Sequence, residues 1–205
     1  RNVIADMVLE SEAALNLSLR VARAVDNQNS NEDERSFARI STAISKYWIT
    51  KRAPYLVFEA LECHGGPGYI EESIMPRLYR EAPLNSIWEG SGNVMCLDVL
   101  RALRRDKNAL PALFRELASA KGSNKNFDES FSHLKETLQD PIDLEIEARL
   151  LTEKMACLIQ ASIFIKSGEE EKVSAFCNSR LGPRWSGAFG TLPSDTNFEY
   201  IMGNL

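Results

Sequence analysis

The chain has 205 residues, of which 44% are hydrophobic and 26% are charged, a balance typical of a globular domain and not of a disordered chain. The formal net charge is −5, with 14 basic and 15 acidic side chains in residues 1–108 and 10 and 14 in residues 109–205. Neither half has the surplus of cations that an extended nucleic-acid surface requires.

An apolar stripe with helical spacing runs from Val3 to Val25, interrupted by Glu10 and Ser11, and predicts one long helix. Polar residues end this pattern. Asn31, with an acid three positions later, predicts the cap of a second helix that runs to about residue 63. Two long helices joined by a short polar link are expected to pack as an antiparallel pair.

A cluster of glycines follows the second helix. Gly65 or Gly66 can take the backbone conformation that ends a helix, and three glycines in four positions also let a backbone approach a ligand closely. Spacing alone favours the helix end. His64, beside this turn, is interpreted as a structural side chain because no neighbour is spaced to activate it.

The stretch from Pro76 to Asn93 delivers one carboxylate, Glu89, between an aromatic residue and a pair of glycines. Such a placement suits a catalytic base. The alternative is a capping box, because Ser86 and Glu89 are three positions apart, and in that case the glutamate only closes back on its own helix start. Spacing alone favours the capping box.

The helix expected after this stretch ends with four cations, Arg101, Arg104, Arg105 and Lys107. At a helix C-terminus, cations offset the negative end of the macrodipole, and this is the favoured interpretation. A DNA-contacting cluster is the alternative, but the flanking sequence does not extend the positive charge.

Four further helical patterns cover residues 110–120, 127–138, 141–166 and 169–179, and no alternating strand pattern occurs. Pro141 fits the first position of its helix, with Glu145 and Ile146 on the face expected to be core. Ser194 is a candidate cap for a last short helix.

The four cysteines, Cys63, Cys96, Cys157 and Cys177, lie far apart and predict neither a disulfide framework nor a metal site. No apolar run reaches the ~20 residues of a membrane span. The first residue is not methionine, so we interpret the chain as a piece of a longer protein, in the cytoplasm or in mitochondria.

Three motifs follow one another: Glu62-x-x-Gly65-Gly66-x-Gly68-Tyr69, Arg80-Glu81-Ala82 and Ile87-Trp88-Glu89-Gly90-Ser91-Gly92-Asn93. Their order and spacing resemble the C-terminal helical domain of acyl-CoA dehydrogenases, and Glu62 and Trp88 are most similar to its AidB-like branch. The resemblance covers residues 1–108. It implies an all-α helical bundle, with residues 109–205 as a helical extension.

The resemblance implies chemistry at this motif. Glu89 would remove the α-proton of an acyl-CoA thioester while FAD accepts a hydride from the β-carbon. Trp88 and Gly90 would line the substrate pocket, which must be dry for a carboxylate to abstract so weakly acidic a proton. Ser91 and Asn93 match positions that hydrogen-bond the flavin cofactor.

The resemblance also implies a homo-oligomer, because Glu62, Gly65 and Gly66 match a segment that reaches the FAD of a neighbouring subunit in a tetramer. Two residues depart from the common family pattern. Glu62 replaces a glutamine and brings a negative charge towards a pyrophosphate, and Trp88 replaces a tyrosine and should narrow the acyl pocket.

In the family, the flavin-holding β-domain precedes the position of Arg1. We therefore expect this chain to bind FAD weakly, to receive a fourth bundle helix from another chain or domain, and to self-associate through its first two helices. The alternative function is a binding module for oligomerisation or nucleic acid, in which Glu89 does no chemistry.

Overall fold

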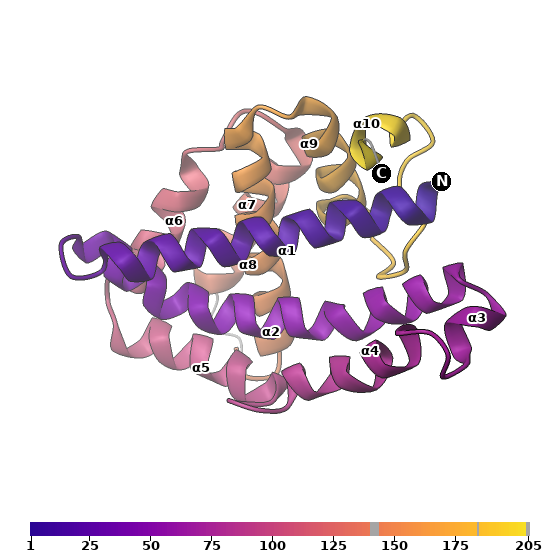
Figure 1. Ribbon diagram of the computed structural model, residues 1–205. Coiled ribbons are helices and arrows are strands. Elements are labelled where there is room, and N and C mark those ends of the chain that lie inside the picture. The colour runs from indigo at the N-terminus through magenta and orange to yellow at the C-terminus, as the bar shows by residue number, and fades with distance from the viewer. Residues whose placement is uncertain (140–143, 184, 204–205) are drawn as a thin grey trace.

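The computed structural model describes residues 1–139, 144–183 and 185–203, and every regular element in this part of the chain is helical (Figure 1). The elements are α1 (Asn2–Asn27), α2 (Glu32–Cys63), α3 (Gly66–Tyr69), α4 (Met75–Glu81), the 3-10 helix η1 (Ala82–Ser86), α5 (Gly92–Arg105), α6 (Ala109–Ala118), α7 (Lys125–Gln139), α8 (Ala148–Ser167), α9 (Glu170–Phe176), the π-helix η2 (Cys177–Leu181) and α10 (Phe198–Met202). The expected all-α fold is confirmed. None of the described helices is long and apolar enough to cross a membrane.

The first two helices lie side by side and run in opposite directions (Figure 1). The link between them ends at Asn31, whose side chain accepts hydrogen bonds from the backbone N–H groups of Asp33 (2.9 Å) and Glu34 (3.2 Å). These bonds satisfy two donors that have no partner inside the helix. Both the antiparallel pair and its cap are as the sequence predicts.

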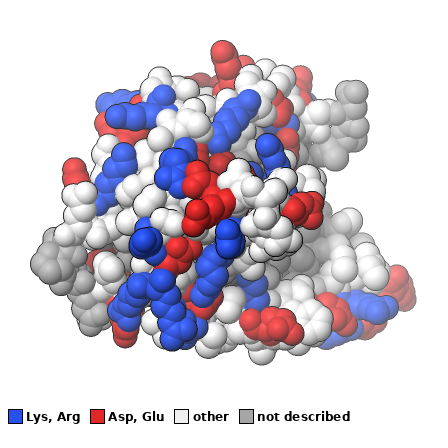
Figure 2. Space-filling view, turned by 90° about the vertical axis from the view of Figure 1, so that its left-hand side faces the viewer, with Lys and Arg blue, Asp and Glu red and all other residues white. Residues whose placement is uncertain are grey.

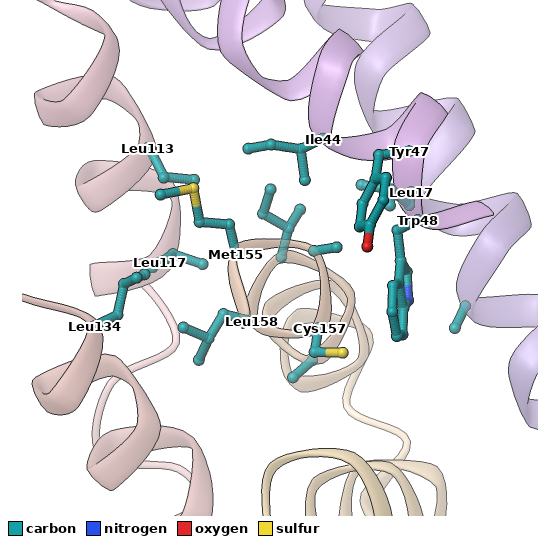
Figure 3. Packing of buried hydrophobic residues seen from close by; sticks show 14 of the residues in the cluster. Leu17, Ile44, Tyr47, Trp48, Leu113, Leu117, Leu134, Met155, Cys157 and Leu158 are labelled. Carbon is teal, nitrogen blue, oxygen red and sulfur yellow. The ribbon is translucent and has the colours of Figure 1, made fainter. Parts of the chain in front are cut away.

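Helix α8 lies at the centre of the molecule. It packs against α1, α2 and α5 on one side and against α6, α7 and α9 on the other. In Figure 3, Met155 of α8 points towards Leu113 of α6, and Leu158 lies on the same side, near Leu134 of α7. Cys157 lies on the other side, towards Trp48 of α2. The helix expected from another chain or domain is therefore supplied by the second half of this chain. One core crosses residue 108, and the division into two domains there remains a prediction.

The start of α8 differs from the expectation. Pro141 lies outside the described residues, and residues 144–147 form turns instead of a first helical turn. Ile146, assigned to the core from its spacing, is 83% exposed. This residue lies in the turns that precede α8, where the neighbouring Glu145 accepts a hydrogen bond from Arg104 of α5 at 3.1 Å.

Two features near the C-terminus also differ. The helix predicted over residues 169–179 is divided into α9 and the π-helical turn η2. The last helix is capped by Asn197, whose side chain accepts a hydrogen bond from the N–H of Tyr200 at 3.1 Å. Ser194 is not the cap, because α10 begins only at Phe198.

The inward face of α1 is rotated from the predicted stripe. Its fully buried apolar residues are Ala5, Leu9, Ala13, Leu17 and Ala24, whereas Leu15 is 57% exposed. The rotation arises because the buried face includes two carboxylates, Asp6 and Glu10. The apolar pattern treats such residues as interruptions, but here they are part of the core.

These two carboxylates meet two buried arginines. Arg180 donates to Glu10 through Nε (3.2 Å) and Nη2 (3.0 Å), and also to Asp6. Arg52 donates through Nε to the other carboxylate oxygen of Glu10 at 3.1 Å. Two negative and two positive charges are thus buried together, which compensates much of the cost of removing them from water.

The same network fixes the chain that follows η2. Asp6 accepts a hydrogen bond from the backbone N–H of Gly190 (2.9 Å), and Arg52 donates to the carbonyl oxygen of Gly187 (2.9 Å). The Arg52 guanidinium also lies 4.7 Å from the ring centre of Phe189. The network therefore joins α1, α2, η2 and the loop over residues 185–190.

We predict that Arg180→Ala lowers the free energy of unfolding by about 3–5 kcal/mol, because it leaves Asp6 and Glu10 as buried charges without Arg180. Arg115→Ala is the control, since it breaks an exposed ion pair with Asp33 and should cost no more than ~1 kcal/mol. Urea unfolding of both variants measures the difference. Equal losses would contradict the importance of the buried network.

Candidate functional site

The loop that presents Glu89 is held by the middle of α2. Lys46 donates a hydrogen bond from Nζ to the carbonyl oxygen of Gly90. At Gly92 an added Cβ would lie only 3.0 Å from Lys51 Cε and 3.4 Å from the ring of Tyr47. The N-terminus of α5 therefore packs closely on α2, and a larger residue at this position would have to displace the end of the Lys51 side chain.

Ser86 and Glu89 do not form a capping box. The Ser86 hydroxyl donates to the carbonyl oxygen of Pro83 at 2.9 Å, and α5 begins only at Gly92, after Ser91. Glu89 has φ 54°, the one positive φ at a non-glycine residue in the part of the chain that the structure describes. A glutamate that closes a helix start would have helical dihedral angles, so the capping hypothesis is wrong.

The surroundings of Glu89 are open in this chain. Ile87 is 62% exposed and Trp88 is 57% exposed, so neither forms a closed wall beside the carboxylate. Burial lowers the pKa of the Lys46 ammonium below its ordinary value, attraction to Glu89 opposes this shift, and repulsion from Lys51 adds to it. The dry pocket expected around Glu89 therefore needs covering groups beyond those described here.

The other predicted cofactor residues lie at the far end of α2. Glu62, Gly65 and Gly66 are exposed, and Gly65 has the positive φ expected after a helix, 62°. Since α2 rises about 1.5 Å per residue, Glu62 lies roughly 24 Å along the helix from Lys46. One copy of this chain does not bring the two sets of predicted cofactor residues together.

The sequence gives no warning of one contact at Asn93. Arg149, at the start of α8, donates from Nε to Asn93 Oδ1 at 2.6 Å, and its Nη2 lies 3.5 Å from the position of a Cβ at Gly92. Together with Lys46 and Lys51, this arginine brings a third cation to the motif.

The cations at the end of α5 are partly neutralised. Arg101 pairs with Asp98 at 2.7 Å and Arg104 with Glu145 at 3.1 Å. Figure 2 shows the end of the molecule where α5 meets α6, and acidic and basic side chains are interleaved there. This arrangement disfavours a continuous DNA-contacting surface.

Metal chemistry has no support among the described residues, where no three histidine, cysteine or acidic side chains gather as a metal site. The four cysteines are free thiols, and only Cys63 is exposed. Burial raises the pKa of Cys177 to about 12, so this thiol stays protonated.

A family model described as "Acyl-CoA dehydrogenase, C-terminal domain" matches residues 1–104, about half of the chain. The chain belongs to the acyl-CoA dehydrogenase family. The match includes all three motifs and the residues predicted as base and cofactor contacts. It ends before α6, so α8 and Arg149 lie beyond the part that the family model describes.

Relatives extend the comparison. AidB of Escherichia coli (strain K12) is 39% identical over 184 residues, which are 90% of this chain and 34% of that protein. Acyl-CoA dehydrogenase family member 11 of Caenorhabditis elegans is 32% identical over 142 residues, 68% of this chain and 23% of that protein. The chain spans a third or less of the length of these relatives. The similarity to AidB continues past the family model into the second half.

Solved structures share the fold. Caenorhabditis elegans ACDH-11, solved in complex with C11-CoA, superposes with a TM-score of 0.72 at 23% identity, over 89% of this chain and 36% of that one. The apo form of Bd2924 superposes with a TM-score of 0.70 at 28% identity, over 79% of this chain and 32% of that one. The helical architecture is therefore that of acyl-CoA dehydrogenases, including much of the region after residue 108.

Two glycines near the predicted cofactor turn differ in how closely other atoms pack around them. At Gly68 an added Cβ would lie 2.3 Å from the carbonyl oxygen of Leu61, whereas at Gly66 nothing lies within 4 Å. We predict that Gly68→Ala destabilises the fold by roughly 1–3 kcal/mol and that Gly66→Ala changes stability by less than about 0.5 kcal/mol. Thermal unfolding of both variants checks this, and a stable Gly68→Ala would contradict the packing of this turn.

Proposed function

We propose that this chain is the C-terminal part of an AidB-like, FAD-dependent acyl-CoA dehydrogenase, in which Glu89 is the base that removes the α-proton of an acyl-CoA thioester. The observation that carries this proposal is the conformation of Glu89. A non-glycine residue at positive φ costs of order 1–3 kcal/mol, and such strain gathers at functional sites. Here it falls on the carboxylate for which the resemblance implies proton abstraction.

The residues of this chain would have different roles in the reaction. Glu89 would accept the α-proton, and Lys46 on α2 would hold the loop through the carbonyl oxygen of Gly90. Trp88 and Gly90 would border the acyl group, with Trp88 narrowing the space. FAD, when bound, supplies the acceptor for the hydride that leaves the β-carbon.

The residues present fit a phosphate-bearing cofactor. Ser91 and Asn93 are exposed beside α5, and Arg149 adds a cation to Asn93. At Gly65 and Gly66 no atom lies within 4 Å of an added Cβ, so the backbone is open to a ligand. Glu62 is exposed at the same turn, and we propose that a cation from a neighbouring subunit compensates its charge beside the pyrophosphate.

The separation along α2 supports two subunits per cofactor. The residues around Asn93 and those around Gly65 are too far apart to hold one end of a single cofactor in one copy of the chain. In a homo-oligomer, Glu62, Gly65 and Gly66 of one subunit would complete the site of another. We therefore expect the chain by itself to bind FAD weakly.

The test of Glu89 uses the protein with its flavin domain. We predict that Glu89→Gln lowers the rate of acyl-CoA-dependent flavin reduction by about 10²–10⁴-fold, the usual contribution of a general base. Glu72→Gln is the control, since it removes an exposed carboxylate in the turn before α4. Stopped-flow absorbance of the flavin follows the reaction.

An unchanged rate in Glu89→Gln would reject Glu89 as the base. It would favour the alternative, a helical oligomerisation or DNA-contacting module without dehydrogenase activity. Thermal unfolding of Glu89→Gln shows whether the substitution changes the stability of the protein as well as the reaction rate. We expect no loss of stability, because the described residues make no hydrogen bond to the Glu89 side chain.

The surface for self-association lies mainly after α1. Most of the large apolar side chains that are exposed fall between residues 55 and 97. They lie on the end of α2, on α3, α4, η1 and α5, which Figure 1 shows along one side of the molecule. A patch of this extent favours a partner, and we propose a second copy of the chain. The contact that we propose therefore lies on the face formed by α3–α5, whereas the sequence analysis expected it on the first two helices.

We predict that the chain self-associates at both low and high salt, because burial of apolar area is not screened as ion pairing is. The double variant Ile74→Ser, Leu78→Ser should be monomeric in sedimentation experiments. Leu15→Ser, Leu19→Ser on α1 is the control, with similar exposure in the native chain. A wild-type monomer at every salt that binds duplex DNA at low salt would favour the nucleic-acid alternative.

A further inference from the structure

Two helix starts lie side by side at the family motif. Helix α5 begins at Gly92 and α8 at Ala148, and the two helices pack against each other. Asn93 is the second residue of α5, and Arg149 is the second residue of α8. Arg149 donates from Nε to Asn93 Oδ1 at 2.6 Å. The region after the family-matched residues 1–104 therefore contacts the motif through one oriented side chain.

A second contact, three residues further along both helices, fixes this arrangement. Burial raises the pKa of the Cys96 thiol on α5, while a hydrogen bond with Thr152 of α8 and the charge of Arg149 oppose the shift. Thr152 is fully buried, and its hydroxyl donates to the carbonyl oxygen of Ala148 at 2.7 Å. The start of α8 is thus anchored in the core, so the Arg149 side chain leaves the helix from a fixed position.

The position of Arg149 is electrostatically unfavourable for the helices. A cation in the first turn of α8 faces the positive end of the helix dipole, and the start of α5 adds a second positive end. Arg149 Nη2 and Lys51 Cε lie 3.5 Å and 3.0 Å from the position of a Cβ at Gly92, and both cations line the pocket of about 800 Å³ between α2, α8 and the loop over residues 185–189. Among the described residues, no acidic side chain forms an ion pair with either of them. Arg149 therefore does not stabilise α8 through its charge, which indicates a role at the motif.

The contact decides which end of the Asn93 amide is available to a ligand. The Arg149 guanidinium carries only donors, so the atom of Asn93 that accepts its Nε–H is the oxygen. In the part of the chain that the structure describes, the Nδ2 group of Asn93 has no acceptor. Asn93 is exposed, so this group can donate to a ligand. Without Arg149 the amide would be free to rotate and to present either its oxygen or its nitrogen.

We propose that Arg149 is a positioning residue, which holds the Asn93 amide so that its Nδ2 group donates to an acceptor atom of the bound cofactor. The inference rests on the proposed function, in which Asn93 hydrogen-bonds FAD. Arg149 acts through Asn93 and does not touch the cofactor itself. Cofactor affinity at a motif in the first half of the chain then depends on a helix of the second half.

The test is a double-mutant cycle on the affinity for FAD, with the protein that includes its flavin domain. Flavin fluorescence during titration of the cofactor-free protein gives the dissociation constant. We expect Arg149→Met, which has no donor, to raise this constant about tenfold, as the loss of one oriented hydrogen bond does. Asn93→Ala should raise it by a similar factor. In the Asn93→Ala protein, Arg149→Met should have no further effect, because the group that Arg149 positions is absent.

Three further variants separate positioning from net charge. Arg149→Lys keeps a donor for Asn93 Oδ1 and should recover part of the affinity. Asn93→Asp keeps an acceptor for Arg149 but has no donor, so it should bind FAD no better than Asn93→Ala does. Arg105→Met removes an exposed cation at the other end of α5 and should bind FAD as the wild type does.

Thermal unfolding separates positioning from a role in folding. The melting temperature of cofactor-free Arg149→Met should stay within about 2 °C of the wild-type value, because an exposed cation at a helix start does not stabilise the helix. A fall well beyond this range would show that Arg149 acts through the fold and would overturn the proposal.

Unchanged FAD affinity in Arg149→Met would also overturn the positioning role. Additive losses in the double variant would overturn it too, because Arg149 would then contact the cofactor directly. Glu89→Gln should bind FAD as the wild type does, so the role of Glu89, which is measured as a rate, and the role of Arg149, which is measured as an affinity, are tested separately. A wild-type protein that binds no FAD would reject the proposed function and this inference together.

Discussion

The buried pairing of Asp6 and Glu10 with Arg52 and Arg180 is the constraint on which the rest of the structure depends. All four residues are at least 93% buried, so each charge has been removed from water and needs its partners in place. The network joins the first helix, the second helix and the last helical turn before the C-terminal loop. It holds Gly187 and Gly190 directly, and so places the aromatic loop that forms one wall of the pocket between α2 and α8.

Helix α2 organises the functional residues. Its middle carries Lys46 and Lys51 beneath the Glu89 loop, and its end carries the exposed glycine turn at Gly65. Helix α2 keeps these two parts apart, and the proposed homo-oligomer would unite them at one cofactor.

The second half of the chain contributes to both stability and the site. Helix α8 is buried against the first two helices and α5, so the core cannot be completed by the family-matched region alone. Its first turn presents Arg149 to Asn93, a residue inside the family motif. The extension therefore shapes the surface next to the Glu89 loop, and the same helix lines the pocket between α2 and α8.

Local chemistry made much of the molecule predictable. The period of the apolar residues placed the helices, and the side chain of Asn31 capped α2 where the cap pattern indicated. The same rule failed at Ser86, because the backbone at Glu89 takes a positive φ that the pattern of residue types does not reveal. The capping rule also failed at Ser194, because the side chain of Asn197 caps the short helix instead.

The sequence by itself determined the helical class, the order of the helices and the motif around Glu89, because periodicity, capping and turn chemistry act over a few neighbouring residues. Only the tertiary structure decided the rotation of α1, the central place of α8 and the contact of Arg149 with the family motif. Arg180 meets Asp6 across 174 positions, and Arg149 meets Asn93 across 56. The first of these contacts forms only when packing of the core buries both charges, and the second only when α8 packs beside α5, so no local pattern of residues records either.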